Sequence, residues 1–336
     1  MSPATIRDVA RSAGVSIATV SRVLNDSPAV RSATREKVLA AMEELDYVPN
    51  LTARRLSLGR TLTIGIALPF LTLPSFTERL RGVQFALADS EYDLALFSAE
   101  VPQKIESCLN NLLGQSRVDG AIIVSIQLNG DQIERLQQRK IPVVLIDAQH
   151  PNMNMVYIDD VAGGRMATQH LIDLGHRRIG FLSDYLENPF DFVSMRHRYK
   201  GYRQALEEAD IEFNPNYQQE GALGGREAYQ KAVHLLTLPE RPTAIFAASD
   251  THAIGVLKAA QDLSIKIPEE LSVIGYDDIR DAEYLNLTTI RQHLFEIGVE
   301  GANMLLNTLR TPNGLPRKLQ LPTQLVVRGT TASPVN

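Results

Sequence analysis

The chain has 336 residues with an apolar fraction of 44% and a charged fraction of 22%, so it is long enough for two or three globular domains. A single cysteine, Cys108, excludes an internal disulfide, and no apolar run approaches the ~18 residues of a membrane span. The first residues lack a basic segment followed by an apolar one, so we expect a cytoplasmic protein without a membrane partner.

The net charge of −5 is unevenly distributed along the chain. Residues 1–60 hold nine basic and six acidic residues, a net +3, which leaves −8 for the rest. A basic N-terminal segment on an acidic protein is typical of a chain that meets a polyanion, although so small an excess can also arise by chance. The charge distribution is therefore compatible with a nucleic-acid partner but is not sufficient to identify one.

Residues 1–48 predict three short helices, with capping residues at Thr5, Ser16 and Ser32. Asp8 lies three residues after Thr5, the spacing of a capping box. Apolar residues recur at helical spacing in each segment, so we expect them to face a common core. The inward residues are Ile6, Val9, Ala10 and Ala13, then Val20, Val23 and Leu24, then Val38, Leu39, Met42 and Leu45.

The stretch GVSIATVSRVLN (14–25) leaves an isoleucine and an arginine on the outward face of the second helix. Two helices separated by AGVS fit a helix-turn-helix, whose second helix enters the major groove of DNA. Arg22 then suits guanine, and Ile17 and Ala18 suit thymine methyl groups. A three-helix bundle with a solvated arginine has the same periodicity, so both interpretations stay open. Side chains suited to the DNA backbone are Thr5, Ser16, Thr19, Ser21 and Asn25.

The segment NLTARRLS (50–57) predicts a fourth helix that is too short to be stable in isolation. It places two arginines beside an apolar leucine, which suits the minor groove, where an apolar side chain can unstack a base step. The alternative is a plain linker whose leucine packs on the following domain. The residues predicted for the minor groove are Asn50, Ala53, Arg54 and Leu56.

From residue 62 onward, short apolar runs alternate with amphipathic helical runs. Near-continuous valine, isoleucine and leucine runs indicate strands buried on both faces, and so many units favour two doubly wound parallel sheets. The predicted strands are 62–68, 93–98, 120–125, 142–147, 178–183, 243–249 and 271–277. The predicted helices lie near 76–89, 103–115, 161–174, 196–209, 225–236, 251–262 and 293–309.

The segments TIRDVARSAGVSIATVSRVLN and YVPNLTARRLS, followed in order by VDGAIIV, IPVVLID, HLIDLGHRRIGF, RPTAIFAASD, IPEELSVIGYDD and LTTIRQ, resemble the lac repressor family of bacterial transcription regulators. The resemblance covers essentially the whole chain. It implies an all-α helix-turn-helix head (1–48), a hinge helix and linker (49–61), and an α/β body (62–336) like the periplasmic sugar-binding proteins. The body's two subdomains would comprise about 62–160 with 293–322, and about 161–290 with 323–336.

The resemblance also implies how DNA is bound. In the family, the positions matching Ile17, Ala18 and Arg22 touch bases, and those matching Leu56 from two subunits intercalate side by side at the operator centre. Ala18 is smaller than the polar residue of some members, so we expect little base readout from it. The implied partner is a pseudo-palindromic double-stranded operator bound by a homodimer. TTASPVN carries no heptad pattern, which favours a dimer over a tetramer, and whether a higher oligomer forms stays open.

By segment matching, the resemblance places a small-molecule effector in a cleft at the carboxyl ends of the body strands. Arginine and aspartate side chains there would hold vicinal hydroxyls against an aromatic wall, although Asp147, Asp250 and Asp277 could instead cap helices. Leucine stands at position 223, where several members place an aromatic ring, which favours a sugar over a purine. The expected effector-binding residues are Phe76, Asp147, Ser194, Arg198, Leu223, Asp250, Asp277 and Gln292. Whether Phe190 and Phe192 enter the cleft stays open.

The sequence therefore predicts a DNA-binding repressor controlled by a carbohydrate-like effector, without a cofactor or metal. A nucleobase or other non-sugar metabolite acting as co-repressor is the alternative. A sugar-modifying enzyme is more distant, because no G-x-S-x-G, P-loop or H-E-x-x-H motif appears and the basic head would be unexplained. Gly163-Gly164 lacks the dinucleotide fingerprint, and His170 and His176 have no cysteine pair for zinc.

Overall fold

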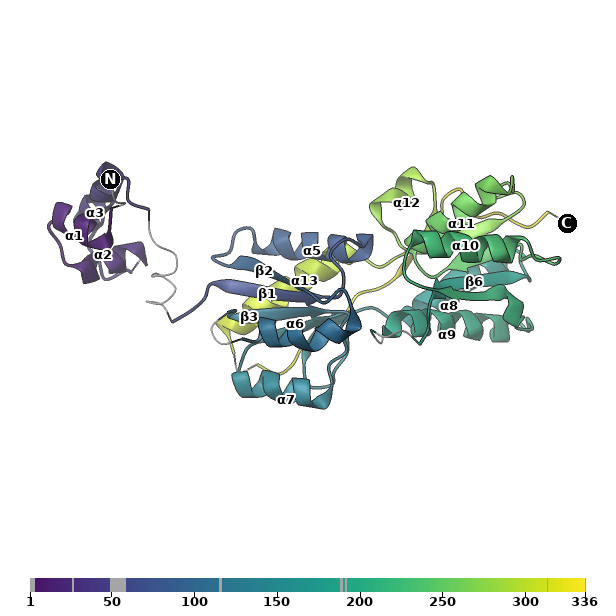
Figure 1. The fold of residues 1–336 in the computed structure, drawn as a ribbon, viewed down its shortest axis with the longest axis horizontal. Helices are drawn as coiled ribbons and strands as arrows, with labels where there is room; N and C mark the ends of the chain where they lie inside the picture. Colours follow the sequence, from purple (N-terminus) through teal and green to yellow (C-terminus); the bar gives the residue numbers. More distant parts are fainter. Residues whose placement is uncertain are drawn as a thin grey trace. The chain divides into compact units, whose positions relative to one another are not determined.

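The computed structural model describes residues 4–25, 27–48, 59–114, 117–187, 190, 192–312 and 314–335. These residues form two compact units that divide between Leu62 and Thr63, which we call the head and the body (Figure 1). The predicted minor-groove residues Asn50, Ala53, Arg54 and Leu56 lie outside the described residues.

The head consists of three helices: α1 (Ile6–Ser12), α2 (Ile17–Leu24) and α3 (Ser32–Glu44). Both predicted caps of the first two helices form. The backbone N–H and hydroxyl of Thr5 donate to Asp8 Oδ2 at 3.0 and 2.6 Å, and the backbone N–H of Thr19 donates to Ser16 Oγ at 3.1 Å. The buried core of the head comprises Val9, Ala10, Val20, Val23, Val38 and Ala41.

Two predictions for α3 are wrong. Arg31 is its N-cap, and Ser32 is already helical, with a hydroxyl that donates to Glu36 at 3.1 Å. Leu39 is 50% exposed and does not join the core. The core face of α3 follows Val38, Ala41 and the half-buried Met42, so Leu39, one residue after Val38, points about 100° away from it.

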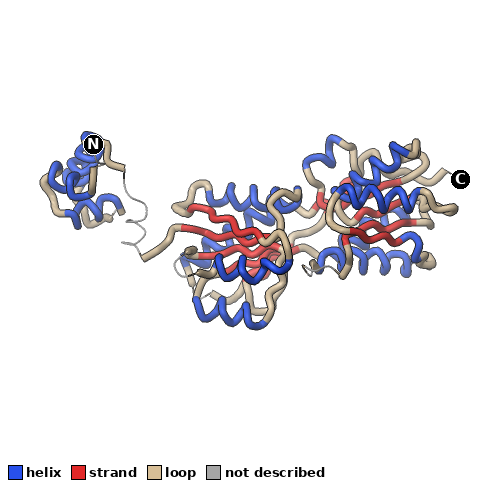
Figure 2. Tube along the Cα trace, in the orientation of Figure 1, coloured by secondary structure: helices blue, strands red, loops and turns tan. Residues whose placement is uncertain are grey.

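The described part of the body forms two six-stranded sheets, as the sequence predicted for this fold class (Figure 2). The first has the order β11-β5-β4-β3-β1-β2 and is parallel throughout. Helices α5 and α13 pack on one face, and α6 and α7 on the other (Figure 1). The elements are β1 (Thr63–Leu68), α5 (Pro74–Leu87), β2 (Asp93–Ser98), a 3-10 turn (Pro102–Lys104), α6 (Ile105–Leu112), β3 (Gly120–Val124), α7 (Gly130–Arg139), β4 (Val143–Ile146), β5 (Asn154–Tyr157), α13 (Leu294–Arg310) and β11 (Lys318–Gln320).

The second sheet has the order β12-β10-β9-β8-β6-β7 and is parallel except for β12. Helices α8 and α9 cover one face, and α10, α11 and α12 the other (Figure 1). The elements are α8 (Asp160–Asp173), β6 (Ile179–Asp184), α9 (Val193–Glu208), a 3-10 turn (Pro215–Tyr217), β7 (Gln218–Gly221), α10 (Gly225–Leu236), β8 (Ala244–Ala247), α11 (Asp250–Asp262), β9 (Ser272–Asp277), α12 (Arg280–Tyr284), β10 (Thr288–Arg291) and β12 (Gln324–Val326).

The chain passes between the two sheets three times, at 158–159, 292–293 and 321–323. We call the units around the first and second sheets the N-subdomain and the C-subdomain. Because all three crossings lie at carboxyl ends of strands β5, β10 and β11, the ends where parallel sheets place their ligands face the boundary between the subdomains.

In each subdomain, a helix pair touches backbone to backbone through glycine. A Cβ added to Gly298 in α13 would lie 2.0 Å from the carbonyl oxygen of Arg79 in α5. A Cβ added to Gly164 in α8 would lie 2.3 Å from the carbonyl oxygen of Arg198 in α9. Real Cβ atoms do not approach so closely, so glycine is what lets these helices pack against the backbone of two buried arginines. Close packing of α8 against α9 therefore accounts for the glycine at position 164, and no nucleotide-binding role is needed to explain it.

Candidate functional site

The head presents side chains on the outward face of α2 that its core does not use. Ile17 is 45% exposed, and Ala18 and Arg22 are exposed, whereas Val20 and Val23 are buried. Among the described residues, the guanidinium of Arg22 has no hydrogen-bond or ion-pair partner. An exposed isoleucine beside an unpaired guanidinium gives one helix face both an apolar and a bidentate donor group.

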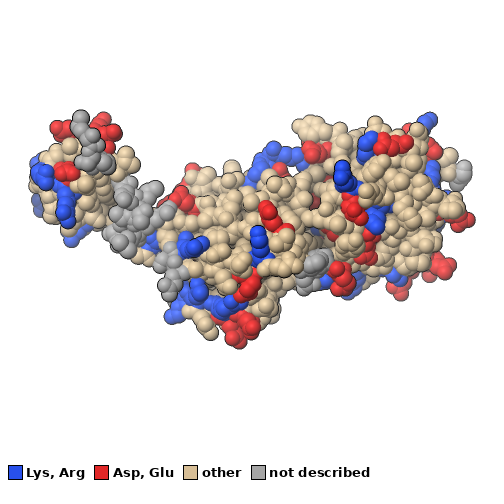
Figure 3. All heavy atoms as spheres, in the orientation of Figure 1, with Lys and Arg blue, Asp and Glu red and all other residues tan. Residues whose placement is uncertain are grey.

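The polar residues predicted to contact the DNA backbone surround this face. Thr5 and Ser16 are exposed at the starts of α1 and α2, and Thr19, Ser21 and Asn25 are half-buried. The Ser16 and Thr19 hydroxyls lie 2.9 Å apart. Most acidic side chains on the visible face of the head lie at one end and the basic ones at the other in Figure 3, although acidic atoms also lie among the basic ones, and both signs are interspersed over the visible face of the body. The head thus combines exposed donors with an uneven charge.

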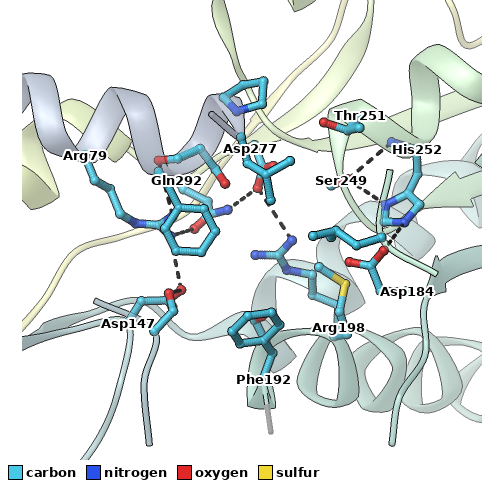
Figure 4. Close-up of a pocket in the computed structure, with 18 of the residues that line it drawn as sticks. Arg79, Asp147, Asp184, Phe192, Arg198, Ser249, Thr251, His252, Asp277 and Gln292 are labelled. Carbon is cyan, nitrogen blue, oxygen red and sulfur yellow. Dashed lines mark hydrogen bonds and ion pairs between the residues drawn. The ribbon is translucent and has the colours of Figure 1, made fainter. Parts of the chain in front are cut away.

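The body contains a cavity at the subdomain boundary, where the carboxyl ends of both sheets meet (Figure 4). The N-subdomain supplies the start of α5 and the residues after β3 and β4: Leu73, Pro74, Ser75, Phe76, Arg79, Ser125 and Asp147. The C-subdomain and the crossing after β10 supply Asp184, Phe192, Ser194, Met195, Arg198, Leu223, Gly224, Ser249, Thr251, His252, Asp277 and Gln292.

Arg198 enters the cavity from α9 and is held on several sides (Figure 4). Its Nε donates to Asp160 at 2.8 Å and one Nη donates to the Ala248 carbonyl at 2.6 Å, and the same Nη lies 3.5 Å from Asp277. The guanidinium also lies 3.8 Å from the ring centroid of Tyr276. Burial alone would lower the pKa of Arg198, but Asp160 and Asp277 raise it, so the guanidinium stays charged.

Arg79 occupies the matching place on the N-subdomain. It donates to Asp147 at 3.3 Å and to Gln292 Oε1 at 3.1 Å, and Ser125 donates its hydroxyl to the same Asp147 oxygen at 2.8 Å. Gln292 in turn donates its amide N–H to Asp277. A continuous polar network therefore runs across the boundary from Asp147 to Arg198. Unlike Arg198, Arg79 keeps one buried group, Nε, without a hydrogen-bond partner among the described residues.

Asp277 lies where the two arginines' networks meet. Burial raises its pKa from 3.8 to about 6, and Arg198 and Arg79 oppose that rise. Its backbone φ is 120°, and Ser125 and Asp147 also have positive φ, so three strand-terminal residues adopt conformations that L side chains rarely take. Asp278 points the other way, to Arg291 at 2.6 Å and Arg328 at 2.7 Å. The two adjacent carboxylates therefore do not form a pair.

His252 joins a serine and an aspartate at the cavity wall. Its Nδ1 lies 2.6 Å from Ser249 Oγ and its Nε2 lies 3.0 Å from Asp184. Hydrolases use the same three residue types for nucleophilic catalysis. Here the backbone N–H of His252 also donates to Ser249 Oγ at 3.2 Å, so the serine serves as the N-cap of α11. These hydrogen bonds hold the side chains of Ser249, His252 and Asp184 in fixed positions at the cavity wall.

Seven of the eight residues predicted for the effector line this cavity: Phe76, Asp147, Ser194, Arg198, Leu223, Asp277 and Gln292. The placement of Asp250 was wrong. Its side chain is fully buried beneath the wall, where it accepts hydrogen bonds from Thr289 Oγ1 at 2.6 Å and from the N–H of Ile279 at 2.9 Å. Ser249 is the cap and faces the cavity, so Asp250, the first helical residue, turns into the core.

Sequence reasoning missed several residues of the wall. Ser125 and Asp184 come directly at the ends of predicted strands, which is a signal that could have found them. Arg79 lies three residues after Phe76 on the same face of α5, so the helical repeat could have indicated it. The question left open for the two phenylalanines is settled in part: Phe192 lines the cavity, whereas Phe190 packs against Phe70 with ring centroids 5.0 Å apart.

The described residues contain neither a candidate membrane span nor a candidate metal site. No helix there is both long and apolar enough to span a membrane. No group of three or more histidine, cysteine, aspartate or glutamate side chains in the same part of the chain is arranged to hold a metal ion. His176 instead bonds Thr243, Ser272 and the carbonyl of Ala332 within the fold.

Comparison with known proteins adds to this geometry. Residues 5–50 match the model of bacterial regulatory proteins of the lacI family, and residues 168–331 match a periplasmic binding protein-like domain. The chain is 36% identical to the transcriptional repressor PurR of Haemophilus influenzae over 91% of each chain. It is 35% identical to the ribose operon repressor of Escherichia coli over 97% of this chain and 99% of the relative.

Among solved structures, the chain is similar to the lac repressor dimer bound to operator and the anti-inducer ONPF. That similarity has a TM-score of 0.86 and 30% identity, and covers 98% of this chain and 99% of the other. The chain therefore combines a three-helix head, a two-sheet body with a cavity at the subdomain boundary, and similarity over nearly its full length. The chain belongs to the lacI family of bacterial regulatory proteins.

Proposed function

We propose that the protein is a DNA-binding transcriptional repressor whose operator affinity is set by a small molecule in the body cavity. The observation that carries this proposal is the outward face of α2, where Ile17 and Arg22 are exposed and the guanidinium of Arg22 has no partner among the described residues. In the major groove, Arg22 would donate two hydrogen bonds to guanine, and Ile17 and Ala18 would contact thymine methyl groups.

The remaining contacts position the head on DNA. Thr5, Ser16, Thr19, Ser21 and Asn25 would bind the sugar-phosphate backbone, which fixes register without reading sequence. Asn50, Ala53, Arg54 and Leu56 would enter the minor groove, a proposal that depends on sequence alone.

We further propose that the protein acts as a homodimer on a pseudo-palindromic operator, in the cytoplasm where such DNA lies. Large apolar side chains on the body support this, because Phe85 is 67% exposed and Tyr284 is 87% exposed. The solved lac repressor similar to this chain is a dimer bound to operator. Two identical heads would then contact two half-sites related by the same two-fold axis.

A sugar or related polyol is the effector class that the cavity supports best. Phe76 and Phe192 give it apolar walls, and Arg79, Asp147 and Asp277 give it the donors and acceptors that neighbouring hydroxyls need. The unpartnered Nε of Arg79 suits an added acceptor oxygen, because a buried N–H without one is unfavourable. A nucleobase is the competing class, since the two phenylalanine rings also suit a planar ligand.

The effector would act through the dimer. By binding more tightly to one relative arrangement of the subdomains, it shifts the population toward that arrangement and changes whether the two hinge segments can pair on DNA. This mechanism needs no chemical step, and the serine nearest His252 already caps α11. We therefore propose a regulator rather than an enzyme.

The test has one arm for each half of the proposal. Selection of bound duplexes from random-sequence DNA should enrich a two-fold symmetric motif, and recovery of DNA without a shared motif would overturn the proposed operator binding. A thermal-shift panel of sugars and nucleobases should raise the melting temperature for one class, because a ligand of the native state stabilises it. Stabilisation by nucleobases alone would replace the sugar with the competing class.

A further inference from the structure

Four phenylalanines form a cluster that joins the two subdomains beside the body cavity. Phe70 follows β1 and Phe76 lies at the start of α5 in the N-subdomain, whereas Phe190 and Phe192 precede α9 in the C-subdomain. The ring centroid of Phe70 lies 5.0 Å from that of Phe190, 6.2 Å from Phe192 and 6.1 Å from Phe76, each edge to face. Phe190 and Phe192 stack at 5.2 Å with 4° between their planes.

These rings divide into two roles. Phe76 and Phe192 line the cavity, but Phe70 and Phe190 do not. Phe70 nevertheless contacts both walls, because its ring meets Phe76 from its own subdomain and Phe192 from the other. Edge-to-face contacts between aromatic rings are favourable and directional, so a ring held in this way keeps its orientation.

We propose that Phe70 is a positioning residue for the effector. It holds Phe192 in place as a cavity wall and links the two subdomains on that side of the cavity before any ligand binds. A wall that is already in place spares the effector part of the ordering that binding otherwise requires. The consequence for the effector rests on the proposed function of the cavity, whereas the positioning of Phe192 and of the subdomains does not.

Fluorine NMR tests the position of the wall. The full-length protein, labelled with 4-fluorophenylalanine, has ten phenylalanine sites, and Phe192→Leu identifies the resonance of interest. Phe70→Ala should shift that resonance by more than its linewidth, and Phe70→Tyr, which keeps the ring, should restore it to near the original position. An unmoved Phe192 resonance in folded Phe70→Ala overturns the proposal. If Phe70→Ala does not fold, Phe70→Leu is measured with the same criterion.

Spin-label distances test the link between the subdomains. Gln138→Cys in α7 and Lys200→Cys in α9 place labels on exposed positions of the two subdomains. Burial raises the pKa of the native Cys108 to about 11, so its thiol stays protonated and does not compete for the label. With labelled chains diluted into unlabelled protein and no ligand or DNA present, Phe70→Ala should broaden the distance distribution, and Phe70→Tyr should not.

Phe213→Ala is the matched control, because Phe213 is also partly buried against the same core but belongs to no contact of the cluster. It should leave both the Phe192 resonance and the distance distribution unchanged. Equal changes in Phe213→Ala and Phe70→Ala would mean general loss of packing and would overturn the proposal. Neither readout uses DNA or an effector, so this result stays separate from the tests of the proposed function.

Discussion

The head and the body place their functional side chains in opposite surroundings. On the head, Arg22 and Ile17 are exposed, and the guanidinium of Arg22 has no partner among the described residues. In the body, Arg79 and Arg198 are each 3% exposed and lie in hydrogen-bonded networks. A surface residue that awaits a partner contributes little to folding, whereas a buried charge depends on its partners for its own stability. A substitution on the head should therefore change DNA binding without changing the free energy of unfolding, whereas a substitution of a cavity arginine should change both ligand binding and stability.

Arg198→Ala should give the largest effect and is the strongest test of that difference. It leaves Asp160 and Asp277 buried without their cation, so we expect a loss of about 3–5 kcal/mol in the free energy of unfolding, together with loss of any effector response. Urea denaturation measures the first quantity. Lys200→Ala, on the exposed side of the same helix, is the control and should change stability by less than about 0.5 kcal/mol. If Arg198→Ala is as stable as the wild type, the proposed difference between exposed head residues and buried body charges is wrong.

Asp277→Asn should change the pH dependence of stability. Because the folded-state pKa is raised from 3.8 to about 6, the folded protein holds a proton that the unfolded chain has lost between these values. The stability contribution of Asp277 is thus fully present below pH 4 and is lost as the pH rises through 6, on the order of 2–3 kcal/mol. The difference in unfolding free energy, wild type minus variant, should fall between pH 4 and 7. A constant difference over that range would contradict the assignment.

Arg22→Ala should affect binding without affecting folding. We expect it to weaken operator binding by about 1–3 kcal/mol at one base pair and to relax the preference there, while the melting temperature stays unchanged. A titration against single-base operator variants measures this. Arg11→Ala provides the comparison, because its side chain is 81% exposed on α1, outside the proposed recognition face. Any loss from Arg11→Ala should be uniform across sequences, and an identical pattern in both variants would refute base reading by Arg22.

The smallest effect is expected at an exposed position of the body. Arg280 in α12 lies 3.2 Å from Glu78 in α5 and so links the two subdomains, yet its side chain is 64% exposed. Solvent screens such a pair, so Arg280→Ala should lower the unfolding free energy by at most about 1 kcal/mol, as measured by urea denaturation. That result would show that burial, rather than membership of the body, sets the cost of losing a charge. A loss as large as that of Arg198→Ala would reject this explanation.

Most of the fold followed from sequence patterns with direct physical causes. The buried strands appear as continuous apolar runs, since both of their faces are covered, and β1 is buried at every residue. The strands that the sequence analysis did not identify include β7 (QQEG), β11 (KLQ) and β12 (QLV), which are short, and the first two are mostly polar. They lie at or near sheet edges, where one neighbour is enough and an apolar run is not needed.

The residues of the cavity were less predictable from the sequence than the fold was. Residues at strand ends, such as Asp147 and Asp277, follow from the rule that parallel sheets bind ligands there. Whether Ser249 or Asp250 faces the cavity depends on which of the two caps α11, and a sequence pattern does not place a helix start to within one residue. Phe70 could not be assigned at all from its surroundings in sequence, because its contacts come from residues 190 and 192. The role of such a residue depends on contacts between segments far apart in the sequence, which a local pattern does not reveal.

The two glycine contacts have a consequence for how this sequence can vary. Gly298 meets the backbone of Arg79 and Gly164 meets that of Arg198, so each cavity arginine is backed by a main-chain atom rather than by a side chain that could adapt. Exposed residues of the cavity wall, such as Leu223, can change when the effector changes, because their side chains contribute little to the fold. The glycines cannot, since any side chain would push apart two helices whatever the ligand. A lineage that acquires a new effector should therefore change the wall and retain the glycines.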